Sequence, residues 1–192
     1  MSAKSILVDL DGVLLDFIGP LCRLLNRPDV MKGRWPGPFR DPEQFQAYAL
    51  EETLSAHELR LVATWMEDGT LAEARSWYKN ARALMAHITA KAPAVILTAG
   101  ANPAWNQQTR ELLASSSIRA TVTFASPETK VLTEGLTLIE DRPDTATLWS
   151  EQHRRFSILL DRPWNRSATL GPKVLRARDF AHVRSLLEAI LR

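Results

Sequence analysis

The sequence of 192 residues carries a formal net charge of +2 at pH 7; 45% of its residues are hydrophobic and 24% are charged. These proportions are ordinary for a globular protein, and the length suits one domain with an insertion, or one medium and one small domain. The single cysteine, Cys22, excludes an intrachain disulfide framework and fits a reducing compartment. No run approaches the roughly 20 apolar residues of a membrane span, and the N-terminus lacks the apolar region of a secretory signal. We therefore expect a cytoplasmic enzyme or binding protein without a membrane partner.

The basic residues are scattered along the chain, apart from pairs such as Arg154-Arg155. A protein that binds polymeric nucleic acid is expected to gather lysines and arginines in a stripe on one face or helix. The sequence therefore favours a small anionic substrate over a nucleic-acid partner.

The first predicted strand runs from Ser5 to Asp9, and its three consecutive apolar residues indicate burial on both faces of a parallel sheet. Asp9 and Asp11 lie two positions apart, so their side chains point to the same side, at the strand end where open α/β sheets bind ligands. Gly12 then allows a sharp turn. By itself, such a run is more often a solvated turn than a site. The rest of the chain has to decide between the two.

About 70 residues with helical spacing, and without a convincing strand, separate this strand from the next one. Ser55 and Glu58 predict a capping box at the start of one helix. The predicted elements are a Pro- and Gly-rich loop at 28–42 and helices at 16–26, 42–50, 55–67 and 71–91. A crossover within a parallel sheet needs far fewer residues. We therefore predict an inserted helical cap.

From residue 94 onward, predicted strands and helices alternate. Asn102 and Pro103 predict a helix start, as N-cap and first helical residue, and Asp179 predicts the cap of a final amphipathic helix. A polar turn is predicted at 127–131 and a short helix at 143–152. The predicted strands are 94–98, 121–124, 136–139, 156–160 and 173–176.

This alternation predicts an α/β fold with a Rossmann-like parallel sheet. We assign residues 1–16 and 91–192 to this α/β core and residues 17–90 to the small helical cap.

Chemically useful side chains gather at the predicted strand ends. The second strand ends at Thr98, the fourth ends at Glu140-Asp141, and Lys130 lies on the loop before the fourth strand. In a doubly wound sheet these ends converge on one crevice together with the acids of the first strand. Clustered carboxylates repel each other and need a cation or raised pKa values, and Mg²⁺ suits oxygen ligands and a phosphate.

The run Asp9-Leu-Asp11-Gly-Val, followed in order by Thr98, Lys130 and Glu140-Asp141, resembles the four motifs of the haloacid-dehalogenase-like (HAD) hydrolases. Within that superfamily the chain looks most like the 5'(3')-deoxyribonucleotidases. The similar stretches are 9–17, 138–144 and 161–166. Trp164-Asn165-Arg166 of the last stretch are expected to form a loop near the site that shapes or orders it and takes no catalytic part.

The resemblance implies a role for each motif residue. Asp9 would be the nucleophile that forms an aspartyl-phosphate, and Asp11 would be the general acid and then the general base. Thr98 and Lys130 would hold the transferring phosphoryl group. Mg²⁺ would be bound by Asp9, the backbone carbonyl of Asp11 and Asp141.

Two departures from the common motifs concern the metal and the phosphate. Glu140 stands where the fourth motif commonly has aspartate, so we expect it to act on the metal through water. Ala99 follows Thr98 where nucleotidases often have a small hydroxyl residue. Either one hydrogen bond to the phosphate is missing there, or the backbone N–H groups of Ala99 and Gly100 supply it.

Aromatic residues of the cap offer a surface for stacking on a nucleobase. Phe17 matches the aromatic residue of the nucleotidase motif and is expected to touch substrate, and Trp35 is a second candidate. The remaining aromatics are expected to form the core of the cap. They are Phe39, Phe45, Trp65, Trp77 and Tyr78. Exposed cap aromatics are equally compatible with a homodimer contact.

Together these features predict a Mg²⁺-dependent phosphomonoesterase that hydrolyses nucleoside monophosphates, above all deoxyribonucleotides. Two alternatives stay open. One is a phosphatase for another small phosphate ester, such as a sugar phosphate. The other is a phosphate-binding module that has lost turnover, against which the quartet Asp9, Asp11, Lys130 and Asp141 argues.

Overall fold

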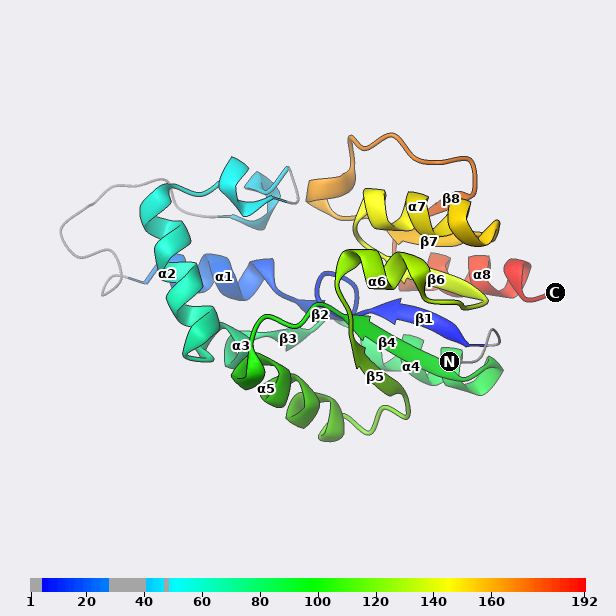
Figure 1. Cartoon of the computed structure of the whole chain (residues 1–192), viewed down its shortest axis with the longest axis horizontal. Helices are drawn as coiled ribbons and strands as arrows, with labels where there is room; N and C mark the ends of the chain where they lie inside the picture. The colour runs from blue at the N-terminus through cyan, green and yellow to red at the C-terminus, as the bar shows by residue number, and fades with distance from the viewer. Residues whose placement is uncertain (1–4, 28–40, 47–48) are drawn as a thin grey trace.

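A six-stranded parallel sheet forms the centre of the protein, in the strand order β5-β4-β1-β6-β7-β8 (Figure 1). The structure is a computed structural model that describes residues 5–27, 41–46 and 49–192. The strands are β1 (Ile6–Asp9), β4 (Ala94–Thr98), β5 (Thr121–Phe124), β6 (Thr137–Glu140), β7 (Ser157–Leu160) and β8 (Val174–Ala177).

Strand β1 lies in the middle of the sheet, where Val8 pairs with Ile96 of β4 on one side and with Ile139 of β6 on the other. After β1 the chain adds β4 and β5 on one side of it and then β6, β7 and β8 on the other side. The carboxyl ends of β1, β4 and β6 therefore border the crevice of a doubly wound fold. The predicted α/β class with a Rossmann-like sheet is confirmed.

Alternate side chains of β1 enter two different hydrophobic layers. Ile6 and Val8 belong to the larger core cluster together with α4 (Ala81–Lys91) and α8 (Phe180–Ile190). Leu7 points to the other face and packs with Trp149 of α7 (Pro143–His153). Helices therefore cover both faces of the sheet, which is why β1 is apolar at three consecutive positions.

The helix-start signals in the sequence act as predicted. Asn102 Oδ1 accepts from the backbone N–H of Trp105 at the start of α5 (Pro103–Ala114). Asp179 does the same for His182 at the start of α8. One helix was missed: α6 (Pro127–Leu132) replaces the predicted polar turn, because Ser126 caps it and Pro127 suits its first position.

The helical insertion predicted after the first strand is present and has a hydrophobic core of its own. Ser55 and Glu58 form the predicted capping box. In Figure 1 the insertion extends beyond the end of the sheet where β1 terminates. Its helical elements are α1 (Ile18–Leu25), η1 (Pro42–Gln44), η2 (Leu50–Glu52), α2 (Ala56–Glu67) and α3 (Thr70–Ala74).

A short antiparallel pair of strands, β2 (Leu15–Asp16) and β3 (Ser76–Trp77), lies where the chain enters and leaves this insertion. Strand β3 interrupts the helix predicted over 71–91, since α3 ends at Ala74 and Asn80 takes a positive φ of 70° before α4 begins. Helical spacing continues through both parts, so the sequence pattern does not reveal the break.

The proposed division into cap and core stays a prediction. Helix α4 lies within residues 17–90, yet its Leu84, Met85 and Ile88 are buried in the core cluster of β1. Phe45 and Trp65 are buried in the core of the insertion, whereas Trp77 and Tyr78 pack against the sheet cluster. Trp35 and Phe39 lie outside the described residues.

No helix among the described residues is long and apolar enough to cross a bilayer.

Substitution of Leu7 by alanine tests the packing of the smaller core layer. Leu7 has no exposed surface, so we expect Leu7→Ala to lower the free energy of unfolding by about 2–5 kcal/mol. Leu148→Ala is the matched control, because this side chain is 53% exposed and its loss should change stability by less than about 0.5 kcal/mol. Urea unfolding followed by circular dichroism measures both. Equal effects would contradict the packing described for Leu7.

Candidate active site

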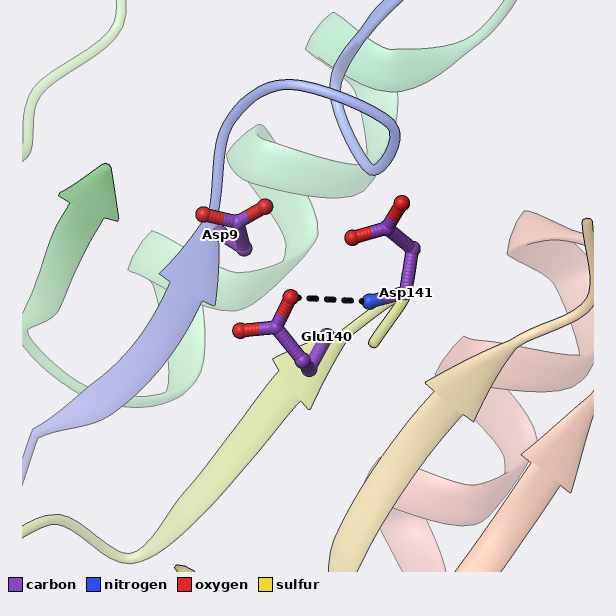
Figure 2. Close-up of side chains that lie close together, drawn as sticks. All are labelled: Asp9, Glu140 and Asp141. Atoms are coloured by element: carbon purple, nitrogen blue, oxygen red, sulfur yellow. Dashed lines mark hydrogen bonds between the residues drawn. The ribbon is translucent and has the colours of Figure 1, made fainter. Parts of the chain in front are cut away.

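Three buried carboxylates meet at the carboxyl ends of β1 and β6. Asp9 ends β1, Glu140 ends β6, and Asp141 follows Glu140 directly. Figure 2 shows the three side chains converging, and one oxygen from each lies within 4.8 Å of the others. The parallel pairing of β1 and β6 therefore brings together Asp9 and Glu140, which are 131 positions apart in sequence.

Lys130 of α6 supplies positive charge to this cluster. Its buried Nζ forms a close ion pair with Asp9 Oδ1 and lies 3.5 Å from Glu140 Oε2. Burial acts to lower the pKa of Lys130, but the carboxylates of Asp9 and Glu140 outweigh it and the pKa rises above its ordinary value. Lys130 is therefore held as an ammonium.

For Asp9 and Asp141 the surroundings disfavour the charged form of the side chain. Burial, and then repulsion from Glu140, raises the pKa of Asp9 to about 8 in spite of Lys130. Burial, followed by repulsion from Glu140 and Asp9, raises the pKa of Asp141 well above its ordinary value. Three ionised carboxylates and one ammonium would leave two negative charges uncompensated, which is the charge of a divalent cation.

The donor set fits Mg²⁺. Asp141 Oδ1 and Glu140 Oε2 are buried without a hydrogen-bond partner in the described part of the chain. Glu140 Oε1 is already occupied, since it accepts from the backbone N–H groups of Asp141 (3.1 Å, Figure 2) and Arg142 (3.3 Å). Hard carboxylate oxygens in a small group are the ligands that Mg²⁺ takes, with water completing its shell.

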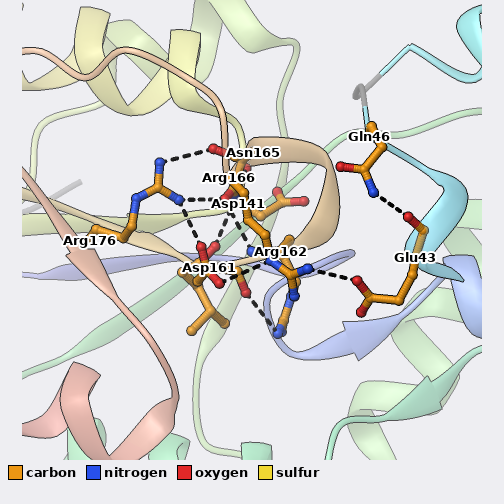
Figure 3. Close-up of polar contacts among 9 residues, drawn as sticks. Glu43, Gln46, Asp141, Asp161, Arg162, Asn165, Arg166 and Arg176 are labelled. Atoms are coloured by element: carbon orange, nitrogen blue, oxygen red, sulfur yellow. Dashed lines mark hydrogen bonds and ion pairs between the residues drawn. The ribbon is translucent and has the colours of Figure 1, made fainter.

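The loop after β7 fixes the position of Asp141. Trp164 Nε1 donates to Asp141 Oδ2 at 2.8 Å, and Asn165 Nδ2 donates to the Asp141 backbone carbonyl at 2.8 Å. Arg176 of β8 holds Asn165 in turn, through its side-chain and backbone oxygens, both at 2.9 Å (Figure 3). The sequence stretch predicted to order the site therefore contacts a cluster carboxylate directly.

The turn after β1 is held against the same loop. Arg162 donates to the backbone carbonyls of Gly12 and Val13, and its guanidinium lies 4.0 Å from the ring centre of Tyr78. Gly12 has a φ of 85°, and a Cβ there would lie 2.1 Å from Asp141 Oδ2. Only glycine leaves room for Asp141 at this point.

Asp11 stands apart from the buried cluster. Its carboxylate accepts from Nη1 of Arg75, at 3.0 Å and 3.1 Å for its two oxygens. The Arg75 side chain is completely buried, and that of Asp11 keeps 25% of its surface exposed. This ion pair was not predicted, and no sequence signal marks Arg75, which lies within the continuous helical pattern of 71–91.

Two cavities adjoin the cluster and share Asp11, Phe17 and Met66 in their walls. The first, of about 280 Å³, contains Asp9 and Lys130 and extends along the loop after β4, residues 98–101. The second, of about 190 Å³, is mostly apolar. Its further lining residues are Gly12, Ile18, Leu50, Asp141 and Trp164. Pockets of this kind, with a few convergent polar groups, are the usual form of small-ligand sites.

The structure places most of the predicted site residues together. The buried cluster and its counter-charge contain Asp9, Lys130, Glu140 and Asp141. The cavity walls contain Asp11, Phe17, Thr98 and Ala99. Trp35 lies outside the described residues. Besides Arg75, the sequence reasoning missed Met66, whose helical spacing indicates an ordinary cap residue.

Solved structures of HAD-like proteins share this fold over nearly the whole chain. A HAD family hydrolase from Deinococcus radiodurans R1, solved with bound phosphate and sodium, is 14% identical, with a TM-score of 0.60 over 97% of this chain and 96% of that one. A HAD phosphatase from Thermococcus onnurineus is 12% identical, with a TM-score of 0.58 over 96% and 97%. The L-2-haloacid dehalogenase PA0810 is 12% identical, with a TM-score of 0.57 over 97% and 99%.

The expected HAD-like fold is thus confirmed, while identities this low establish the fold alone. Comparisons with protein-family models and with curated proteins gave no match.

The raised pKa values predict how stability depends on pH and metal. An aspartate in the unfolded chain has a pKa of about 3.9, whereas that of Asp9 in the fold is about 8. The metal-free fold therefore binds more protons than the unfolded chain between these values, and its stability falls as the pH rises through this window. Mg²⁺ competes with those protons, so it should raise the thermal midpoint more at about pH 8 than at about pH 5.5.

Differential scanning fluorimetry with Mg²⁺ or a chelator measures this, in wild type, Asp141→Asn and Asp144→Asn. The side chain of Asp144 is 58% exposed and pairs with Arg142, so Asp144→Asn should respond as wild type does. Asp141→Asn should lose most of the Mg²⁺ effect. A response to Mg²⁺ that is independent of pH and survives Asp141→Asn would place the metal elsewhere.

Trp164→Phe tests the hydrogen bond to Asp141. The substitution keeps an aromatic ring and removes the donor, so we expect Mg²⁺ affinity to fall about tenfold, as for other groups that orient a metal ligand. Isothermal titration calorimetry gives the affinity. Trp77→Phe is the control, because Trp77 Nε1 has no hydrogen-bond partner within the described chain. Equal affinities in both variants would show that the indole does not orient Asp141.

Proposed function

We propose that the protein is a Mg²⁺-dependent phosphomonoesterase that hydrolyses nucleoside monophosphates, above all deoxyribonucleotides. One observation carries the proposal: Asp9 and Lys130 line a cavity that continues along the loop after β4, and Asp141, of the same buried carboxylate cluster, lines the adjoining cavity. That arrangement offers a nucleophile, a cation site and a positive charge around one small volume. A phosphoryl group needs all three.

In the first step Asp9 attacks phosphorus with a carboxylate oxygen, and the bond from phosphorus to the ester oxygen breaks. Asp11 gives its proton to the departing oxygen, so the alcohol leaves neutral. Asp9 then carries the phosphoryl group. In the second step water attacks phosphorus, its proton passes to Asp11, and inorganic phosphate and the free Asp9 carboxylate result.

The surrounding groups would bind the phosphoryl oxygens. Lys130, Thr98, Ala99 and Gly100 line the same cavity. The Lys130 ammonium, the Thr98 hydroxyl and the backbone N–H groups of Ala99 and Gly100 would donate to these oxygens. Asp9, Asp141 and the backbone carbonyl of Asp11 would hold the metal, with Glu140 acting through water. When bound, Mg²⁺ neutralises charge that develops on the phosphoryl group.

The second acid favours phosphate esters over haloacids among the reactions found on this fold. Asp11 is placed on the cavity wall beside Asp9, where it can exchange a proton with a leaving group. Dehalogenase members of the superfamily lack this acid and need no metal. Without a metal ion, the negative charge of the acidic cluster would stay uncompensated and would repel a haloacid, since this substrate is itself an anion.

The smaller cavity supports a nucleobase as part of the substrate. Apart from Asp11, Gly12 and Asp141, which lie toward the carboxylate cluster, its walls are formed by apolar and aromatic side chains. They are Phe17, Ile18, Leu50, Met66 and Trp164. A sugar phosphate would bring several hydroxyl groups that these walls cannot satisfy, whereas the flat face of a base suits them. The ring centres of Phe17 and Trp105 lie 6.3 Å apart in an edge-to-face arrangement, and this contact supports the Phe17 ring beside the cavity.

Contacts from Trp35, a homodimer and a cytoplasmic location stay predictions from the sequence.

Asp9→Asn tests the reaction itself. We expect Mg²⁺-dependent release of phosphate from 4-nitrophenyl phosphate by wild type, and a loss of at least about 10³-fold in kcat/KM for Asp9→Asn, because the amide is not a nucleophile. Asp144→Asn should retain activity. If wild type releases no phosphate from any ester in a metal-dependent way, the proposal is wrong and the phosphate-binding module without turnover remains.

A substrate panel tests the leaving group. Nucleoside 5'- and 3'-monophosphates should be hydrolysed with kcat/KM at least about tenfold above sugar phosphates, since a buried apolar contact contributes that much discrimination. Phe17→Ala should narrow this difference by lowering the values for nucleotides alone. Equal values across the panel would favour a phosphatase for other small esters.

A further inference from the structure

Arg75 is buried at the junction between the insertion and the sheet. It follows α3 directly and precedes β3, whose partner β2 comes just after the Asp11 turn. Its Nε donates to the backbone carbonyl of Ala72 at 3.3 Å, and its Nη2 donates to Thr109 Oγ1 at 2.7 Å. The remaining nitrogen, Nη1, donates to Asp11. Each nitrogen of the guanidinium therefore has a defined partner.

Helix α5 fixes the plane of this guanidinium. The Trp105 ring lies 4.1 Å from Arg75 Cζ, and Thr109, one turn further along, donates to the Trp105 carbonyl at 2.8 Å. Trp105 is buried and Thr109 has no exposed surface. An arginine held by stacking and by a fork of donors in this way has little freedom to reorient.

Such burial excludes a direct role for Arg75 in binding substrate. Its side chain has no solvent-accessible surface, whereas the Asp11 carboxylate is partly exposed and lines both cavities. A buried guanidinium is costly unless it is paired. The observed partner of Arg75 is Asp11, which is the general acid of the proposed reaction and lies at the cavity wall.

The contact leaves Asp11 able to exchange a proton. A single nitrogen meets both carboxylate oxygens, so each oxygen keeps lone pairs that Arg75 does not use. Without this contact the aspartate would be free to rotate about its side-chain bonds at the cavity surface. A displacement of the reacting group by about 1 Å is enough to cost roughly 10²-fold in rate.

We infer that Arg75 is a positioning residue, which aims the Asp11 carboxyl at the leaving oxygen of the substrate. The inference rests on the proposed phosphatase reaction. The proton moves from Asp11 to the ester oxygen as the bond to phosphorus breaks, and a proton of water later returns to Asp11. Arg75 keeps its own protons throughout.

A matched pair of esters tests this role. Phenyl phosphate needs its leaving oxygen protonated more than 4-nitrophenyl phosphate does, because the nitro group stabilises the phenolate. For Arg75→Met, kcat/KM for phenyl phosphate should fall by roughly 10²-fold, and that for 4-nitrophenyl phosphate by less than about threefold. Asp11→Asn should show the same selectivity. The ratio of the two values does not depend on how much of the preparation is folded.

Two further variants control for structural damage. Arg82→Met removes an arginine that lies 5.4 Å from the Trp77 ring in the same region, and it should leave the ratio as in wild type. Thr109→Val removes the acceptor for Nη2 and keeps the charge of Arg75, so it should shift the ratio in the same direction by a smaller factor. If Arg75→Met does not fold, the ratio of the two kcat/KM values in Thr109→Val tests the role of Arg75.

The outcomes separate this inference from the proposed function. A ratio shifted in the Arg75 or Thr109 variant, and unchanged in Arg82→Met, supports the inference. An active wild type with an unchanged ratio in the Arg75 and Thr109 variants overturns the inference alone. A wild type that hydrolyses neither ester overturns the proposed function, and the inference falls with it.

Discussion

Mutual repulsion among Asp9, Glu140 and Asp141 is the constraint on which the rest of the site depends. Burial, and then repulsion from the neighbouring carboxylates, raises the pKa values of Asp9 and Asp141, so these two groups favour holding a proton. Lys130 offsets part of the repulsion, and the remainder matches one divalent ion. The fold therefore stores an unfavourable charge arrangement that binding of a cation relieves. Sites of this kind are less stable when empty than their packing would allow.

The sheet topology accounts for where the charges lie. Because β1 runs between β4 and β6 and parallel to both, its carboxyl end lies beside the carboxyl ends of both neighbours. The helical insertion begins where the turn after β1 ends, so the cavities form between the insertion and the sheet without a separate binding domain. Arg75, where the chain returns from the insertion just before β3, donates to Asp11, which lies just before β2. The insertion thus contributes to the polar part of the site as well as to the apolar wall.

The parts of this arrangement that follow from local patterns could be predicted. The apolar run of β1, the acids at strand ends and the capping residues Ser55, Asn102 and Asp179 each act through neighbours in sequence, and the fold class follows from their order. Contacts between distant segments could not be predicted in the same way. Arg75 pairs with Asp11 from 64 positions away, and nothing in a helical pattern distinguishes a buried arginine from a solvated one.

Atom-level contacts were also beyond the sequence. The loop of Trp164 and Asn165 was expected near the site, yet the hydrogen bond from an indole to a particular carboxylate oxygen depends on the packing of β6, β7 and β8 together. Similarly, the spacing of α4 predicts an amphipathic helix and does not say whether its apolar face covers the sheet or the insertion.

Arg176 connects the C-terminal edge of the sheet to Asp141, one of the proposed metal ligands. Strand β8 is the last strand of the sheet and pairs with β7 alone, and its Arg176 holds Asn165, which holds the Asp141 backbone. Edge strands open locally more often than central ones. Opening of β8 would release this chain of contacts and loosen Asp141. If Asp141 binds the proposed ion, ion binding should in turn slow amide hydrogen exchange at an edge that has no atom in the site. Affinity for the ion is thereby linked to the local unfolding equilibrium of the most peripheral strand.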